Sequence, residues 1–243
     1  MCPYGAPDDS NILSPEGLQR VDDLAELAAR MGSIVNYSRS GNIWLLEDFE
    51  GDISKWRTQT GPAAGEVVVC DERVYSGNIS LKMETGVGVD PYAYLAKWMP
   101  VPPISRIGLA TTFSFADDIE YLHWEVNFTE GLLAYHFRVQ YWPVAGRLTF
   151  NDPAWGFIEF ALPGPMDTTQ PTFHSGKLVV DMLTKEYIGF WFDNTGYDLT
   201  GKVGPTTAFA FAPISEFVLY AEAVNPGPAF CYLDNVILTY NEF

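Results

Sequence analysis

Few residues of the types that carry out catalysis occur in this chain of 243 residues. The three histidines, His123, His136 and His174, do not have the spacing of a metal-binding motif. The chain contains neither a G-x-S-x-G nucleophile elbow nor a glycine-rich phosphate-binding loop. The remaining candidates are carboxylates, which calcium prefers as ligands, and aromatic rings, on which sugar rings stack.

The chain is strongly acidic, with a net charge of −17 and an isoelectric point near 4.3. Such a chain repels phosphate backbones and anionic lipids, so we expect no nucleic-acid binding and no membrane insertion. The acidity is typical of a soluble, non-adhesive surface. The alternative is that some of the carboxylates bind a divalent cation.

Three aromatic residues lie beside predicted turns: Tyr141, Trp142 and Trp155. They are candidates for a carbohydrate-binding surface, because an aromatic face flanked by polar groups can hold a sugar ring. The alternative for each of them is packing in the core. Core packing is what we expect for Phe49 and Trp56, since a two-sheet core needs large apolar side chains.

The elements that must position these residues are strands. Aromatic residues make up 15% of the chain, and 21 glycines and 17 prolines supply turns. From residue 43 onward, about ten to twelve strand-like stretches alternate with turn clusters such as PVAG, DPAWG and DNTG. The pattern predicts an all-β fold, an antiparallel two-sheet β-sandwich over residues 43–243.

Residues 1–42 precede this β domain and have a different pattern, an extended arm followed by a helix. The helix is predicted over about residues 15–31, because Ser14 precedes Pro15 as an N-cap and Gly32 follows the last turn. The apolar face of this helix consists of Leu18, Val21, Leu24, Ala28 and Met31. We expect the arm and helix to anchor the protein in an assembly; packing on the sandwich is the alternative. No signal peptide is predicted.

The three cysteines, Cys2, Cys70 and Cys231, form neither a disulfide framework nor a zinc-binding spacing. Cys70 and Cys231 lie in strand-like stretches, so we expect buried thiols, with a single bridge between them left open.

Several stretches, in their order along the chain, resemble a known group of folds. DFEGDISKW near the start, ERVYSGNISLKME after it and YLDNVIL at the end are similar to jelly-roll carbohydrate-binding modules of the galactose-binding-like and concanavalin-A-like kinds. FHSGKLVVDMLTKEYIGFWFDNTGYDL resembles the laminin-G-like lectin pattern. The resemblance covers roughly residues 44–240 and implies a fold rather than a function.

The resemblance also implies that the first and last strands lie side by side. Glu50, after the first strand, and Asp234, on the last strand, would then converge on one structural calcium ion. Backbone carbonyls near residues 76–78 would complete its shell of six to eight oxygens. The alternative is that Asp234 caps a bulge or accepts hydrogen bonds from the neighbouring turn.

The stretch HWEVNFTE resembles the Glu-x-Asp-x-x-Glu motif of laminarinase-type glucanases. The resemblance would make Glu125 the nucleophile and Glu130 the acid, with the two carboxyl groups about 5–5.5 Å apart. Asn127 replaces the central Asp, and an amide cannot carry the charge that helps to set the neighbouring pKa values. A strand that turns its apolar residues inward would leave Glu125 and Asn127 simply facing solvent, so we predict no catalytic residues here.

Three functions are compatible with these features. The first is a non-enzymatic virion structural protein of the capsid-associated or decoration type, because an arm, a helix and a jelly roll without an export signal resemble uncharacterised bacteriophage structural proteins. Its partners would be other virion proteins and further copies of the chain. The second is a carbohydrate-binding module or lectin that recognises a polysaccharide, outside the cell or at its surface. The third, least expected, is a glucanase-like glycoside hydrolase. Apart from structural calcium, no cofactor is expected.

Overall fold

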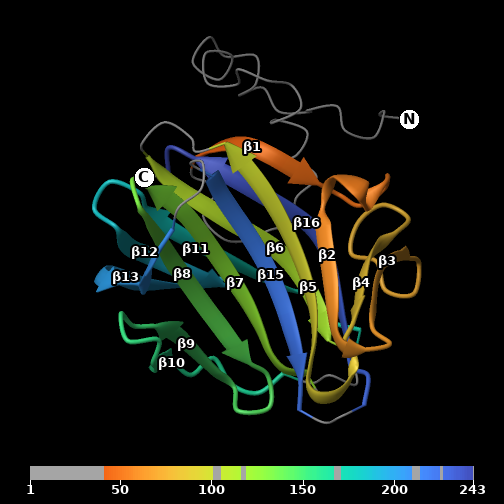
Figure 1. The fold of residues 1–243 in the computed structure, drawn as a ribbon. Coiled ribbons are helices and arrows are strands. Elements are labelled where there is room, and N and C mark those ends of the chain that lie inside the picture. Colours follow the sequence, from red (N-terminus) through yellow and green to blue (C-terminus); the bar gives the residue numbers. More distant parts are fainter. Residues whose placement is uncertain are drawn as a thin grey trace, which may run out of the picture.

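The structure is a computed structural model that describes residues 41–100, 105–115, 119–166, 171–209, 214–224 and 227–242. Two antiparallel β-sheets, A and B, pack face to face (Figure 1). The predicted two-sheet β-sandwich is therefore confirmed. The predicted helix, with Leu18, Val21, Leu24, Ala28 and Met31, lies outside the described residues, and the predicted domain boundary near residue 42 stays a prediction.

Each sheet has eight strands. The order in sheet A is β13 (Thr195–Val203), β12 (Glu186–Phe192), β11 (His174–Asp181), β6 (Arg106–Phe115), β16 (Phe230–Tyr240), β4 (Ser80–Glu84) and β3 (Glu66–Cys70), with β1 (Asn42–Glu47) also paired to β16. The order in sheet B is β10 (Phe157–Ala161), β9 (Arg147–Asn151), β8 (Leu133–Trp142), β7 (Ile119–Glu130), β15 (Ile214–Ala223), β5 (Val87–Pro100) and β2 (Arg57–Ala63), with β14 (Thr206–Ala208) paired to β8. A short 3₁₀ helix, η2 (Ile53–Lys55), joins β1 to β2.

The first described strand, β1, and the last, β16, are hydrogen-bonded neighbours, as the resemblance implied. The chain between β1 and β2 is held by the buried carboxylate of Glu47. This carboxylate accepts hydrogen bonds from the indole Nε1 of Trp56 at 2.8 Å and from the amide of Phe49 at 3.2 Å, and it pairs with Lys55 at 2.7 Å. Phe49 and Trp56 are buried in the core, so their predicted packing is confirmed.

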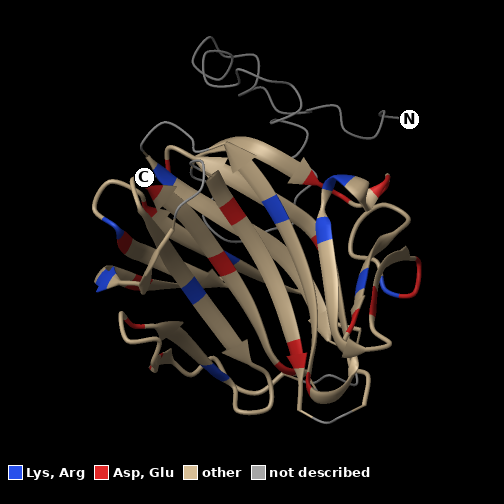
Figure 2. Ribbon diagram, viewed as in Figure 1, with Lys and Arg blue, Asp and Glu red and all other residues tan. Residues whose placement is uncertain are grey.

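Side chains of sheet B alternate between the core and the outer face, as the pleat of a strand requires. On β7 the core-facing residues are Leu122, Trp124, Val126 and Phe128. The pairing of β7 with β8 is regular from Leu122 to Glu130, so no bulge reverses this alternation. The outer face therefore receives the polar residues between them, and Figure 2 shows acidic positions spaced along β7 and β15 in the middle of this face.

The described cysteines, Cys70 and Cys231, are free thiols: Cys231 is buried and Cys70 is partly buried. Burial raises the pKa of the Cys231 thiol, which makes it unreactive. None of the helices within the described ranges is long and apolar enough to cross a membrane.

Candidate functional site

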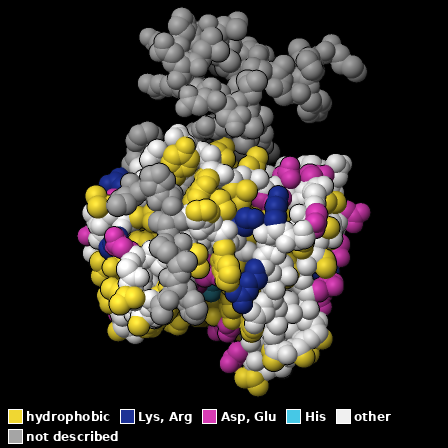
Figure 3. Space-filling view, turned by 45° about the horizontal axis from the view of Figure 1, so that its top comes forward, with side chains coloured by type: hydrophobic (Ala, Val, Ile, Leu, Met, Phe, Trp, Pro, Cys, Tyr) yellow, Lys and Arg dark blue, Asp and Glu magenta, His cyan; other side chains and the backbone are white. Residues whose placement is uncertain are grey.

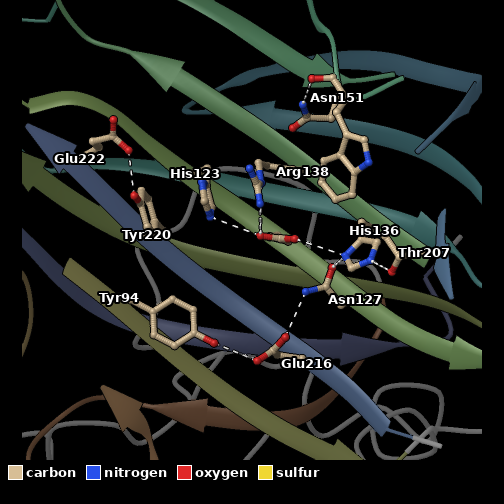
Figure 4. A network of polar contacts seen from close by, with 12 residues as sticks. Tyr94, His123, Asn127, His136, Arg138, Asn151, Thr207, Glu216, Tyr220 and Glu222 are labelled. Carbon is tan, nitrogen blue, oxygen red and sulfur yellow. Dashed lines mark hydrogen bonds and ion pairs between the residues drawn. The ribbon is translucent and has the colours of Figure 1, made fainter. Parts of the chain in front are cut away.

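A hollow of about 360 Å³ lies on the outer face of sheet B. Its lining residues are Gln59, Tyr92, Tyr94, Tyr121, His123, Glu125, Arg138, Val218 and Tyr220. They come from β2, β5, β15, β7 and β8, which are consecutive in the sheet. Figure 4 shows the polar side chains of this face directed toward one another across the strands.

The register of the strands explains why this face is hollow. One row across the strands consists of Trp98, Glu216, Asn127 and His136. A second row consists of Tyr94, Tyr220, His123 and Gln140. The row between them consists of Ala96, Val218, Glu125 and Arg138. Because Ala96 and Val218 are small, a groove remains between two rows of larger side chains. We call this feature the sheet B groove.

Glu125 is the charged centre of the sheet B groove. It is only 6% exposed, so it does not simply face solvent as the alternation of β7 suggested. Two nitrogens of Arg138 donate to its Oε2, at 2.9 and 3.2 Å, and His136 Nδ1 lies 3.7 Å from its Oε1. Burial acts to raise the pKa of Glu125, but His136 and the Arg138 guanidinium outweigh it and bring the pKa to about 2. Glu125 is therefore an anion whose charge Arg138 neutralises.

His123 lies beside Glu125 and is 3% exposed. Its ring stacks on Tyr220, with ring centroids 4.6 Å apart and an interplanar angle of 4°. Neither ring nitrogen has a hydrogen-bond partner, although Nε2 is 3.4 Å from Glu125 Oε2. Burial, followed by the charge of Arg138, holds the pKa of His123 well below its usual value. The ring is therefore neutral near pH 7, with one nitrogen that can donate and one that can accept.

Three of the four tyrosines that line the hollow donate their hydroxyl hydrogens to two carboxylates, whereas the hydroxyl of Tyr92 accepts from Gln59 at 2.6 Å. Tyr121 and Tyr220 donate to Glu222 Oε2, at 2.5 and 2.8 Å. Tyr94 donates to Glu216 Oε1 at 2.8 Å. Burial is the main reason why the pKa of each of these phenols is raised, and the adjacent carboxylates raise it further. These phenols therefore stay protonated.

A tight turn between β9 and β10 brings Trp155 to the edge of the groove. Asp152 Oδ1 accepts hydrogen bonds from the amides of Ala154 and Gly156, at 3.0 and 2.7 Å, and this closes the turn. Trp155 has a φ of 65°, a left-handed conformation that is strained for a residue with a β-carbon. Its ring packs 5.1 Å from His136 and remains 42% exposed. The turn therefore places a partly exposed tryptophan ring beside the groove.

The three aromatic residues predicted for carbohydrate binding have different environments. Tyr141 lies in the core, where its hydroxyl donates to the carbonyl of Gly164 at 2.8 Å, so its ring is not available to a ligand. Trp142 lies on the outer face of sheet B, but the guanidinium of Arg147 covers its ring at 4.7 Å. Trp155 is the one of the three that borders the groove and is exposed, with the Arg138 guanidinium 6.0 Å from its ring centroid.

The glutamates of the HWEVNFTE motif lie on opposite sides of sheet B. They are an odd number of residues apart on a strand with regular register, so their side chains point in opposite directions. Glu130 pairs with Lys185, in the turn between β11 and β12, at 2.7 Å. This motif therefore does not bring together the two carboxylates that retaining glycoside hydrolysis needs.

The predicted calcium ligands, Glu50 and Asp234, both contact the loop of residues 71–79. Glu50 Oε1 accepts hydrogen bonds from the amides of Asn78 and Ile79, at 2.5 and 3.0 Å. Asp234 Oδ2 accepts hydrogen bonds from the amides of Tyr75 and Ser76, at 3.0 and 2.9 Å. The loop thus presents N–H groups to these carboxylates rather than carbonyls to a cation.

Asp234 keeps one feature that fits a cation. Its Oδ1 is buried and without a hydrogen-bond partner, and burial raises its pKa to about 6. Within the described ranges, no group of three or more His, Cys, Asp or Glu residues is arranged to hold a metal ion. Asp234 therefore fits better than Glu50, and calcium binding stays a prediction.

Sequence patterns alone did not identify most residues of the groove. His123, Arg138, Trp98, Glu216 and Tyr220 lie on four different strands and form no motif along the chain. The alternation within each strand was the available signal. It assigns each of these residues to the outer face, but it does not show which of them are neighbours on that face.

No protein-family model matches the chain. No curated protein matches it either. Solved structures do share its fold. The cellulose-induced protein Cip1 has a TM-score of 0.56 and is 14% identical, with 80% of this chain and 96% of that chain covered. An endo-β-1,4-glucuronan lyase from the fungus Trichoderma reesei has a TM-score of 0.57 and is 12% identical, with 82% and 95% covered. A carbohydrate esterase from the Shiga toxin-encoding bacteriophage phi24B has a TM-score of 0.54 and is 14% identical, with 83% and 100% covered.

Identities this low establish the fold alone. The fold is a jelly-roll sandwich of the concanavalin-A-like and galectin-like kind, so the resemblance inferred from the sequence is confirmed.

Proposed function

We propose that this protein binds carbohydrate in the sheet B groove. The observation that carries the proposal is a groove with an exposed tryptophan near each end and buried polar groups between them. Trp98 on β5 is 56% exposed with the Arg57 guanidinium 5.5 Å from its ring centroid, and Trp155 beyond β8 is 42% exposed with the Arg138 guanidinium at 6.0 Å. In the space-filling view, Lys and Arg side chains lie beside hydrophobic side chains in the middle of the visible face (Figure 3).

The groove crosses the strands, so its direction suits an extended saccharide. Trp98 and His136 are three strands apart, which is about 14 Å at the usual strand spacing, and Trp155 lies beyond His136. Both tryptophans can stack on a sugar ring, while the polar groups between them contact its hydroxyl groups. The names of the fold neighbours, a cellulose-induced protein, a glucuronan lyase and a carbohydrate esterase, support the same class of ligand.

Binding to a glycan array tests this proposal. We expect saturable binding to at least one glycan, and a loss of roughly tenfold or more on Trp98→Ala or Trp155→Ala, because removal of an aromatic anchor from a binding site costs about 1–2 kcal/mol or more. Trp142→Ala should have a smaller effect, because that side chain is only partly exposed and Arg147 lies closer to its ring, at 4.7 Å. Leu183→Ala, on the turn between β11 and β12, is the control variant. The absence of any glycan binding would contradict the proposal.

We further propose that the protein is a virion surface component and that the groove faces outward from the particle. The supporting observations are the fold neighbour from a bacteriophage and the predicted anchoring segment at residues 1–42. Sedimentation of native source material on a density gradient, with mass spectrometry of the fractions, tests this location. Migration with the major capsid or filament proteins is the expected result, and migration with small soluble proteins would contradict it.

An enzyme that acts on a polysaccharide in the same groove is the alternative. The observation that favours it is His123, a neutral ring with an unpartnered nitrogen that can accept a proton from a substrate. Incubation with glucuronan, mannuronan and β-glucans, followed by analysis of the products, tests this function. Any turnover should fall at least a hundredfold on His123→Ala, given the usual contribution of a general base. A glucanase would instead be recognised by loss of β-glucan hydrolysis on Glu125→Gln.

A further inference from the structure

We infer that the saccharide in the sheet B groove is uncharged, that is, rich in hydroxyl groups and without carboxylates. This inference rests on the proposed carbohydrate binding and specifies the class of ligand. It depends on which hydrogen-bonding groups of the groove are already used within the protein and which remain for a ligand.

Most donors of the groove are already engaged by carboxylates of the same face. Two nitrogens of Arg138 donate to Glu125, and three phenols donate to Glu216 or Glu222. The indole of Trp98 and the amide of Asn127 also donate to Glu216, at 2.7 and 3.2 Å. A ligand carboxylate brings acceptors only, so it would compete with these internal carboxylates for the same donors.

Acceptors, in contrast, remain available. Each phenol oxygen that donates its hydrogen keeps lone pairs that can accept a hydrogen bond, and so do the carboxylates of Glu216 and Glu222. Sugar hydroxyl groups bring the donors that such a surface needs. The groove is therefore complementary to hydroxyl groups.

The charges of the groove disfavour an anionic ligand for a second reason. Arg138 is the cation among the residues that line the hollow, and its charge is neutralised by Glu125 at 2.9 Å. Arg57, paired with Ala96 at the β2 end of the groove, adds a second guanidinium over the rings of Tyr94 and Trp98. The carboxylates of Glu125, Glu216 and Glu222 still outnumber these two guanidinium groups. Glu216, which accepts a hydrogen bond from Tyr94, borders the groove on one side. Glu222, which accepts hydrogen bonds from Tyr121 and Tyr220, borders it on the other. A ligand carboxylate would lose its hydration and approach two carboxylates of like charge, which is costly in a partly buried site.

His123 supplies the contact that identifies a hydroxyl group. Its ring is neutral, and Nε2 faces the carboxylate of Glu125 at 3.4 Å, so the ring hydrogen is best placed on Nε2 and Nδ1 is left as a buried acceptor without a partner. A sugar hydroxyl group can donate a hydrogen bond to Nδ1. A carboxylate has no hydrogen to donate and would leave Nδ1 without a partner.

Pairs of glycans that differ only in the oxidation of C6 test this inference. Array binding is measured for neutral and uronate glycans, and binding in the groove is defined by its loss on Trp155→Ala. Calorimetry then compares the two members of a pair, such as β-1,4-glucan with β-1,4-glucuronan oligosaccharides or mannan with mannuronan oligosaccharides of equal length. We expect the neutral member to bind at least roughly tenfold tighter, and its affinity to change little with added salt.

Variants of His123 test its role separately. His123→Ala should weaken binding of the neutral ligand by roughly fivefold to tenfold, as the loss of about one hydrogen bond predicts, while His123→Gln, which keeps one donor and one acceptor, should retain part of the affinity. Leu183→Ala should bind as the wild type does. Melting curves establish that each variant is folded.

The outcomes separate this inference from the proposed function. Uronate glycans that bind in the groove as tightly as their neutral counterparts, with an affinity that falls as salt is added, would overturn the inference and leave carbohydrate binding intact. An array without any binding that depends on Trp155 would overturn both. An unchanged affinity in His123→Ala would remove His123 from the recognition of the ligand.

Discussion

Two buried carboxylates show how the immediate partners of a residue set its ionisation. Glu125 has the guanidinium of Arg138 at 2.9 Å, and its pKa is about 2. Asp234 has only backbone amides as donors, and its pKa is about 6. Burial acts in the same direction on both groups, so the side chains of His136 and Arg138 beside Glu125 account for the difference.

Replacement of Glu125 by Gln should destabilise the protein by about 2 kcal/mol at pH 7, because Arg138 would lose its carboxylate partner. The folded pKa of Glu125 lies below the ordinary value of 4.5, so its stabilising contribution is present above pH 4.5 and is lost as the pH falls toward 2. Urea unfolding at pH 7, 4 and 3 should therefore show a shrinking difference between wild type and Glu125→Gln. The exposed Glu159→Gln is the control, and a constant difference would contradict the assignment.

Asp234 should have the opposite effect on stability. Its folded pKa of about 6 is above the ordinary value of 3.8, so its contribution is present below about pH 3.8 and is lost as the pH rises through 6. In the wild type, the free energy of unfolding should fall by about 3 kcal/mol over this pH range. In Asp234→Asn this decrease should be absent. The difference in unfolding free energy between wild type and Asp234→Asn, measured from pH 3.5 to 7.5, checks the sign. If the stability of the wild type relative to Asp234→Asn increases as the pH rises, the raised pKa of Asp234 is contradicted.

Calcium bound at Asp234 should reverse the pH dependence of stability, because the ion binds only the ionised carboxylate. The ion would stabilise the ionised carboxylate, so 5 mM calcium should raise the melting temperature of the wild type by roughly 2 °C or more at pH 7, as expected for at least about 1 kcal/mol of binding energy in a domain of this size. Asp234→Asn and wild type with EDTA should not respond. Equal melting curves with calcium and with EDTA would reject the calcium prediction.

At the scale of the element, strand register and one turn create the binding face. The groove requires small residues at Ala96 and Val218, which are paired across β5 and β15, between rows of larger side chains. A shift of register by one residue would turn these positions into the core. The β9–β10 turn adds Trp155 to this face through its left-handed backbone conformation.

The turn provides a prediction that separates binding from stability. Trp155→Ala and Trp155→Gly should both lose glycan affinity, because neither has a ring beside the groove. The glycine variant should be more stable than the alanine variant by about 1 kcal/mol, since glycine adopts a φ of 65° without strain. Chemical denaturation of the two variants measures this difference. Equal stabilities would show that the backbone strain at Trp155 is negligible.

At the scale of the whole molecule, one continuous core joins the two sheets. Its residues extend from Phe49 near the first strand to Leu238 on the last one, so both ends of the described chain contribute to it. The pairing of β1 with β16 closes sheet A with strands from both ends. We therefore expect the described part of the sandwich to fold as one unit.

Removal of residues 1–32 should leave this unit folded and abolish assembly. The core cluster of the described residues already joins both sheets from Phe49 to Leu238, so the truncated chain should keep a cooperative thermal transition within a few degrees of the full chain. Near-UV circular dichroism measures the transition, and analytical ultracentrifugation of both chains measures association. A truncated chain without a cooperative transition would mean that the segment belongs to the core.

The sequence by itself determined the class of fold. Alternating apolar and polar residues, turn clusters and a high aromatic content predict a two-sheet sandwich, and the large residues Phe49 and Trp56 were recognised as core. Such features are local, because each strand shows its core-facing residues through its own period of two. The same period assigned Glu125 and Asn127 to the outer face.

Only the tertiary structure decided which side chains meet on that outer face. His123, Arg138, Trp98 and Glu216 become neighbours because β5, β15, β7 and β8 pair in one register, and no local pattern encodes which strands pair. Tyr141 and Trp142 are adjacent in the chain, yet one lies in the core and the other on the outer face of the sheet. The burial of Glu125 likewise follows from the side chains of neighbouring strands. The alternation of apolar and polar residues along a strand determines which side chains face the core. The pairing of the strands determines which side chains become neighbours on the outer face.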